Sequence, residues 1–136
     1  MWLADTTFII DLINSDIEAV KIAKKIDSKR SIVFISVITI QEYLRGIYFL
    51  FGHKSDQFNK KISQAEGDLA RFSWLDVNYN IAKVAAEIDA DLTRKGEQIG
   101  YADVLIGATA QFYQLTLLTR NKTHFERIPR IQIEVY

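Results

Sequence analysis

Residues 100–114 read GYADVLIGATAQFYQ, and this stretch decides much of the fold. From Val104 to Ala110 nearly every residue is apolar or small, which is typical of a helix buried on most of its sides. Asp103 stands at the start of that helix. A carboxylate in such a place is costly unless it is paired, hydrogen-bonded or bound to a cation. The stretch therefore predicts a central helix whose first acid faces a partner.

On both sides of this helix, short β-prone runs alternate with longer helical stretches. The runs typical of strands are Trp2–Ala4, Ile32–Ile35, Phe72–Val77, Leu115–Thr119 and Ile131–Val135. The stretches typical of helices are Thr7–Asn14, Ile17–Ile26, Val37–Phe51, Ser55–Ala70, Ile81–Arg94 and Ala102–Tyr113. Strands joined by helices need crossover connections, so we expect a three-layer α/β/α fold with a central, largely parallel sheet. Ligands in such folds bind beyond the carboxyl ends of the strands.

Composition limits the classes of protein to consider. A chain of 136 residues with 49% hydrophobic content can form one packed core, so we expect a single domain over residues 1–136. The 17 basic and 17 acidic side chains balance, without the strong positive field of many nucleic-acid-binding proteins. Cysteine is absent, and the two histidines, His53 and His124, argue against a histidine-rich metal site. With no leader-like N-terminus and no apolar run long enough to span a bilayer, we expect a cytoplasmic protein.

Three acids occupy positions where this fold would carry chemistry. Asp5 directly follows the first strand, Glu42 lies in the helix after the second strand, and Asp103 opens the buried helix. Each has a purely structural alternative, which is an N-cap for Asp5 and Asp103. For Glu42 the alternative is an ion pair with Arg45 at i, i+3. For Asp5 alone, capping is the simpler interpretation. For Glu42, the structural and functional interpretations are balanced. For Asp103, the apolar helix behind it favours a functional role.

The three carboxylates would converge at one edge of the sheet. Two such charges 4 Å apart repel by roughly 1 kcal/mol in water and by about 4 kcal/mol at an effective dielectric of 20. A cation offsets this repulsion, and oxygen ligands without nitrogen or sulfur select Mg²⁺ or Mn²⁺. A carboxylate-held ion that keeps several waters is suited to activating water against a phosphodiester. The sequence therefore predicts a metal site formed by Asp5, Glu42 and Asp103.

Four segments together resemble a known family. They are ADTTFIIDLI (4–13), ISVITIQEYLRGI (35–47), YADVLIGATAQFYQLTLLTRNKTHFERIP (101–129) and RIQIEV (130–135). Their order resembles PIN-domain nucleases, and most closely the ribonuclease toxins of VapBC type II toxin–antitoxin pairs. The resemblance implies divalent-metal-dependent cleavage of single-stranded RNA, inhibition by a cognate antitoxin, and catalytic roles for the three acids in the order in which this chain carries them.

The segment TRNKTHF (119–125) departs from that family. Many relatives place a fourth acid there, whereas this chain has Asn121 and His124. Asn121 is a candidate catalytic residue that would hold a metal-bound water or orient Asp103, and its alternative is to shape the turn. One metal ion is expected, and a second is in doubt. His124 is interpreted as a turn or surface residue that can approach a substrate phosphate.

Substrate contact requires hydroxyl or basic side chains near the acids. Thr6 adjoins Asp5, while Arg120 and Lys122 flank the predicted metal edge. Basic residues in such runs usually form a solvated face, but their position makes Arg120 and Lys122 candidates for phosphate contact. We therefore expect Thr6, Arg120 and Lys122 to contact RNA.

Leu44, Tyr48 and Phe51 form a helical stripe at i, i+4 and i+7. A stripe of this kind usually means core or a subunit interface, and the family resemblance makes it a candidate surface for the antitoxin or for a homodimer. Two alternatives remain at this point. One is a PIN-type nuclease of RNA maturation or structured DNA that has no antitoxin, and the other is a binding module whose acids are only caps and ion pairs.

Overall fold

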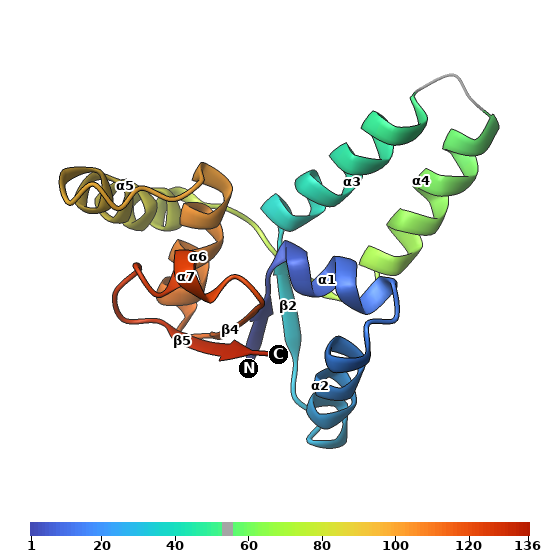
Figure 1. Ribbon diagram of the computed structural model, residues 1–136, viewed down its shortest axis with the longest axis horizontal. Helices are drawn as coiled ribbons and strands as arrows, with labels where there is room; N and C mark the ends of the chain where they lie inside the picture. Colours follow the sequence, from blue (N-terminus) through green and yellow to red (C-terminus); the bar gives the residue numbers. More distant parts are fainter. Residues whose placement is uncertain (53–55) are drawn as a thin grey trace.

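The computed structural model describes residues 1–52 and 56–136 (Figure 1). Its strands are β1 (Trp2–Ala4), β2 (Val33–Ser36), β3 (Ser73–Leu75), β4 (Thr116–Thr119) and β5 (Gln132–Val135). Its helices are α1 (Thr6–Ile13), α2 (Ile17–Ser28), α3 (Val37–Phe51), α4 (Asp56–Leu69), α5 (Tyr79–Arg94), α6 (Tyr101–Tyr113) and α7 (Lys122–Phe125). The elements expected from the sequence are present, but the expected start of the fourth helix at Ser55 lies outside the described residues, as does His53.

The strands form a wholly parallel sheet in the order β3-β2-β1-β4-β5. In the central strand β1, Leu3 pairs with Phe34 of β2 on one side and with Leu117 of β4 on the other. Parallel neighbours cannot be joined by a hairpin, so the connecting helices return the chain to the opposite end of the sheet. The carboxyl ends of β1, β2 and β4 therefore meet at one edge.

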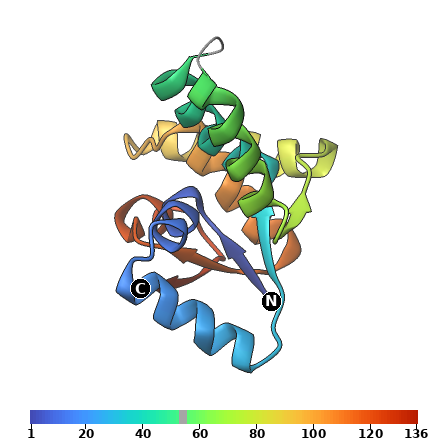
Figure 2. The same cartoon turned by 90° about the vertical axis from the view of Figure 1, so that its right-hand side faces the viewer.

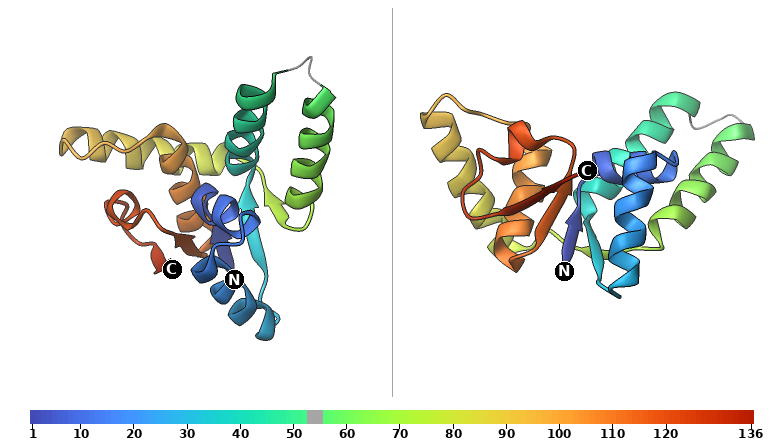
Figure 3. Two further views of the ribbon diagram at one scale, coloured as in Figure 1. Left: turned by 45° about the vertical axis from the view of Figure 1, so that its right-hand side comes forward. Right: turned by 60° about the horizontal axis from the view of Figure 1, so that its bottom comes forward.

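Side chains of the central strands alternate between two hydrophobic cores. Leu3 and Leu117 belong to the first core, which contains the buried side chains of α5 and α6. Ala4 and Leu118 belong to the second core, which contains those of α1 and α2. This alternation follows from the two-residue period of a strand. Figure 3 shows the resulting layers, with the sheet between the two groups of helices, and it confirms the predicted three-layer α/β/α architecture.

Helix α6 is the buried helix predicted at the start. All residues from Val104 to Ala110 are buried. Gly107 lies where the chain after β4 packs against the helix, because a Cβ atom at this position would stand 2.2 Å from Cδ1 of Ile128. The close approach of these two segments therefore requires glycine or a shift of the Ile128 side chain.

Helices α3 and α4 pack side by side and extend away from the sheet as an arm (Figures 1 and 2). The ring of Tyr48 on α3 lies 5.1 Å from that of Phe58 on α4. Near the outer end of α3, the side chains of Phe49 and Leu50 are 79% and 71% exposed. The arm thus presents apolar surface that the sheet does not cover.

The short helix α7 was not predicted from the sequence. It has four residues, and a single turn shows no helical periodicity. Its buried residue Phe125 belongs to the first core, so packing on the rest of the protein holds this turn. Among the described residues, no helix is both long enough and apolar enough to cross a membrane.

Candidate active site

The three predicted acids lie on elements that start at the carboxyl edge of the sheet. Asp5 follows β1 and is the N-cap of α1. Glu42 lies in the second turn of α3, which begins directly after β2. Asp103 lies in the first turn of α6. The fold thus brings these residues, which are far apart in the sequence, to neighbouring elements.

Asp5 is buried, with 3% of its surface exposed. Its Oδ1 accepts hydrogen bonds from the Phe8 amide at 2.9 Å and from the Thr7 hydroxyl at 2.7 Å. Its Oδ2 accepts from the Thr119 hydroxyl at 2.5 Å. Asp5 is therefore an N-cap, as its structural alternative proposed, but a cap needs neither full burial nor a partner on β4. The carboxylate is held at both oxygens.

Burial raises the pKa of Asp5 above its usual 3.8, and the charge of Asp103 raises it further. The hydrogen bonds from Thr119, Phe8 and Thr7 oppose the rise without cancelling it. The charge of Asp103 is the last and smallest of these influences on Asp5. A bound cation would offset both causes of the raised pKa.

Glu42 is held by α1. Its Oε1 accepts a hydrogen bond from the Thr6 hydroxyl at 2.6 Å, and the same hydroxyl lies 3.2 Å from that of Thr39. Among the ion pairs between described residues, none joins Glu42 to Arg45. The surface ion pair that was the alternative for Glu42 is therefore not formed. Thr6, which was expected to contact substrate, links Glu42 to the helix that Asp5 caps.

Asp103 does not cap its helix, so the capping interpretation was wrong for this residue. The N-cap of α6 is Gly100, which makes no side-chain capping bond, whereas Asp103 lies three residues into the chain after it. A carboxylate in the first helical turn is still favoured by the helix dipole. Its Oδ2 lies 3.0 Å from Nδ1 of His124. The partner of Asp103 in the protein is therefore a histidine.

The segment after β4 supplies that histidine together with Asn121. The side-chain amide of Asn121 lies 2.8 Å from the same Nδ1 of His124, so Asn121 reaches Asp103 through the ring rather than directly. From the sequence, His124 was interpreted as a turn or surface residue that can approach a substrate phosphate, and its contact with Asp103 was not predicted. The available signal was that His124 stands in the segment where the fourth acid of relatives was expected.

The donor set fits Mg²⁺ or Mn²⁺ in kind, because it consists of carboxylate oxygens. Within the described part of the chain, however, no three His, Asp or Glu side chains are close enough to hold a metal ion as they stand. Asp103 is bonded to His124 and Glu42 to Thr6. The three carboxylates would have to draw closer together to bind one ion, which Oδ1 of Asp103 and Oε2 of Glu42 could do while the bonds to Oδ2 and Oε1 are kept.

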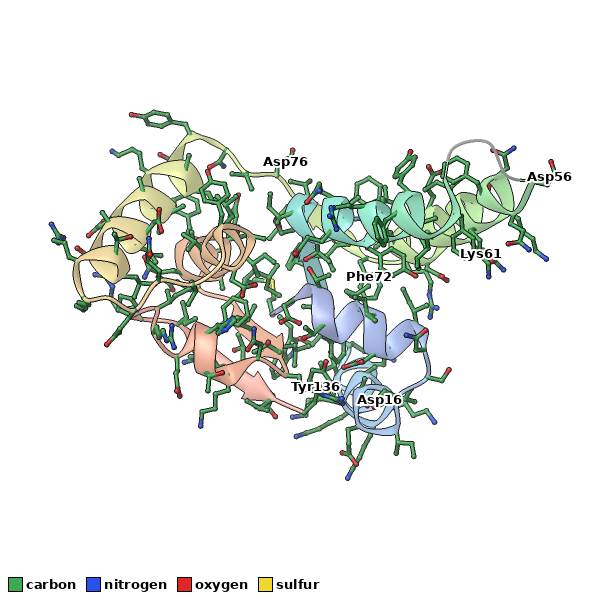
Figure 4. The ribbon with its side chains drawn as sticks, turned by 45° about the horizontal axis from the view of Figure 1, so that its top comes forward. Asp16, Asp56, Lys61, Phe72, Asp76 and Tyr136 are labelled. Atoms are coloured by element: carbon green, nitrogen blue, oxygen red, sulfur yellow. The ribbon has the colours of Figure 1, made fainter. Side chains whose placement is uncertain are left out.

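Arg120 has partners other than the acids at the site. Its guanidinium group lies 3.0 Å from Asp16 and 3.5 Å from Asp11, and it stacks over the ring of Tyr136 at 4.8 Å. Figure 4 shows Asp16 and Tyr136 on the same side of the molecule. Lys122, the other basic candidate, is exposed at the start of α7. Of the two, Lys122 is the cation not engaged in an ion pair among the described residues.

Comparisons with known proteins agree with this geometry. A family model described as PIN domain matches residues 3–131. The chain is 31% identical over 133 residues to the tRNA(fMet)-specific endonuclease VapC of Salmonella typhimurium, covering 98% of this chain and 96% of that protein. The structure is similar to DNA-bound VapBC from Salmonella typhimurium, with a TM-score of 0.82, 31% identity, and 98% and 96% of the two chains covered. It is similar to VapBC2 from Rickettsia felis bound to a promoter DNA fragment, with a TM-score of 0.84, 25% identity, and 99% and 98% covered. The match over nearly the whole chain, on a fold that gathers acids at the carboxyl edge of its sheet, shows that this chain belongs to the PIN domain family.

Proposed function

We propose that this protein is a metal-dependent endoribonuclease, the toxin of a type II toxin–antitoxin pair, acting as a single nuclease domain over residues 1–136 in the cytoplasm. The observation that carries the activity is the buried Asp5 carboxylate, whose pKa is raised by burial and by the neighbouring Asp103. Perturbed pKa values cluster at functional sites, and a cation bound beside Asp5 would offset both causes of the raised pKa. The relatives named above are VapC ribonucleases and VapBC complexes, which supports the same reaction and the same kind of partner.

Asp5, Glu42 and Asp103 would hold Mg²⁺ or Mn²⁺. When bound, the ion would supply positive charge that offsets the carboxylates. It would also lower the pKa of water, so that hydroxide is available at neutral pH to attack a phosphodiester. The chain itself orients these ligands: Thr119 and Thr7 fix Asp5, Thr6 fixes Glu42, and His124 fixes Asp103.

The residues around these acids would contact the RNA. Lys122 is exposed beside the acids and offers charge to a phosphate. Arg120 and Thr6 remain candidates, although in the protein alone Arg120 pairs with Asp16 and Thr6 bonds to Glu42. Asn121 would orient Asp103 through His124 or hold a water.

The test is cleavage of RNA by the purified protein with Mg²⁺, with Mn²⁺ and with excess chelator. We expect cleavage only with metal. Asp103→Asn keeps the size of the side chain and an oxygen that accepts from His124, but it removes the charge that the ion needs. It should leave a folded protein with no activity.

Glu87→Gln is the matched control, because it removes one exposed carboxylate from α5. It should cleave at the wild-type rate. Cleavage by Asp103→Asn at the wild-type rate, or cleavage by the wild type in chelator, would refute the proposed mechanism.

The antitoxin would dock on the arm. A groove of about 460 Å³ runs between α1, α3 and α4, and Tyr43, Ile47 and Phe51 form its apolar wall at i, i+4 and i+8. This spacing suits an amphipathic helix laid along the groove. Phe51 was expected at such a surface, whereas Leu44 packs against the second core and Tyr48 against Phe58. A homodimer is the second assembly we propose, with the exposed apolar end of α3 as its candidate contact.

A further inference from the structure

Three contacts at a regular spacing fasten one face of α6 to the segment that follows β4. They join Asp103 Oδ2 to His124 Nδ1 at 3.0 Å, Gly107 to the side chain of Ile128, and Gln111 Nε2 to the carbonyl oxygen of Pro129 at 2.7 Å. The α6 residues are four positions apart and therefore lie one above the other on the helix. The segment 124–129 is thus seated on the helix face that carries Asp103, and this seating places the His124 ring.

The tautomer of the His124 ring follows from its carboxylate neighbour. An ionised carboxylate only accepts hydrogen bonds, so Nδ1 carries the proton that it shares with Oδ2 of Asp103. Nδ2 of Asn121 lies 2.8 Å from the same nitrogen. Because Nδ1 carries one proton and gives it to the carboxylate, Asn121 is a close neighbour of the ring and not a second acceptor. His124 therefore donates to Asp103.

Asp5 and Asp103 differ in how firmly the protein holds them. Asp5 accepts three hydrogen bonds, from Thr7, Phe8 and Thr119. Asp103 is one-quarter exposed at its side chain. Among the described residues, His124 is the one side chain that the structure bonds to it. The orientation of the Asp103 carboxylate thus depends on His124 far more than that of Asp5 depends on any single partner.

We propose that His124 is a positioning residue of the active site. It binds Oδ2 of Asp103, so that Oδ1 of the same carboxylate would remain available to hold the ion. The inference rests on the proposed metal-dependent activity and adds to it a residue that the acids alone do not reveal. Partners of this kind behind a metal ligand fix its orientation, and their loss weakens metal binding by about 10- to 100-fold.

The experiment measures Mn²⁺ binding by isothermal titration calorimetry on the purified full-length protein, without substrate. His124→Leu should raise the dissociation constant for Mn²⁺ by about 10- to 100-fold. His124→Asn should recover most of the loss, because its amide N–H can stand where Nδ1–H stands. Thr123→Ala, an exposed change in the same short helix, should bind Mn²⁺ as the wild type does.

Kinetics with RNA give a second measurement. At limiting Mn²⁺ the kcat of His124→Leu should fall while KM for RNA stays constant, and saturating Mn²⁺ should restore kcat. A residue that only stabilises the fold would not produce this pattern. If circular dichroism shows that His124→Leu is unfolded, His124→Gln replaces it, because its longer side chain cannot place an N–H at the Nδ1 position.

Unchanged or tighter Mn²⁺ binding by His124→Leu would overturn the inference, and tighter binding would mean that His124 competes with the metal. If the wild type binds Mn²⁺ and cleaves RNA in that case, the proposed function stands without His124. If the wild type binds no Mn²⁺, the metal-dependent mechanism fails and the inference fails with it.

Discussion

The Asp5 carboxylate accepts hydrogen bonds from three groups, and burial still holds its pKa above 3.8. The folded protein without metal therefore keeps the proton on Asp5 to a higher pH than the unfolded chain, which releases it near the usual pKa. Folding stability from this residue is fully present below 3.8 and is lost as the pH rises through the raised pKa. At neutral pH Asp5 thus stores a cost that only a cation relieves.

We accordingly expect Asp5→Asn to become more stable relative to the wild type as the pH rises from acidic to neutral. Asparagine caps a helix nearly as well as aspartate, so the capping bond to Phe8 persists while the buried charge is removed. Thermal melts of both proteins in chelator, across this pH range, measure the difference. Saturating Mn²⁺ should stabilise only the wild type, by about 2.7 kcal/mol at 100 times its dissociation constant. A stability difference that does not change with pH would show that the carboxylate is not strained.

At the scale of the element, α6 depends on the missing side chain of Gly107. Because a Cβ atom there would stand 2.2 Å from Cδ1 of the buried Ile128, we expect Gly107→Ala to lower the free energy of unfolding by about 1–3 kcal/mol, the usual cost of overpacking. Denaturant unfolding measures it. Gly67→Ala on α4 is the matched control: its Cβ meets nothing within 4 Å, so it should gain about 0.5–1 kcal/mol from helix propensity.

The clash can be tested directly, because Ile128→Val removes the Cδ1 methyl group that the new Cβ would meet. In the Ile128→Val background the cost of Gly107→Ala should therefore shrink. A double-mutant cycle measures this coupling between neighbouring residues. Strictly additive effects would show that the contact between α6 and the segment after β4 is not what requires glycine.

The sequence predicts the elements well because their periods are strong and local. The alternation of strands and helices predicts the parallel sheet, and the apolar run 104–110 predicts the buried helix. The sequence does not predict which side chains of different elements contact one another. His124 meets Asp103 only because α7 packs where Gly107 leaves room. Arg120 pairs with Asp11 and Asp16 and lies over the ring of Tyr136, which itself bonds to Asp11. Such contacts join distant parts of the chain and leave no periodic trace.

At the scale of the whole molecule, the arm of α3 and α4 carries both Glu42, near its base, and the groove proposed for the antitoxin. Figure 4 shows Asp56 at the far end of the arm and Lys61 along α4, away from Tyr136. The groove along the arm is also lined by Ile13, at the end of α1, the helix whose N-cap is Asp5. A partner seated there would contact the same helix that orders the acids.

We expect Ile47→Glu to escape the antitoxin while keeping RNA cleavage. A charge in the apolar wall of the groove should weaken the complex by about 2 kcal/mol or more, as the loss of a central interface anchor does. Growth of cells that express the variant together with the antitoxin, and co-purification of the two proteins, measure the effect. Phe49→Ser, on the exposed end of α3, is the control and should stay inhibited. Full inhibition of Ile47→Glu by the antitoxin would show that the antitoxin does not bind in this groove.

The hydrogen bond from Thr119 to Asp5 spans 114 positions of the chain, and the central strand β1 needs β4 as a neighbour. A ribosome must therefore translate beyond Thr119 before the nascent chain can build the surroundings of Asp5. Sheets that pair strands far apart in the sequence also form slowly, because the entropy of the intervening chain is lost before the contacts between the strands stabilise the fold. Newly made toxin thus passes through an inactive interval, during which an antitoxin already present in the cell can reach it before it can cut RNA.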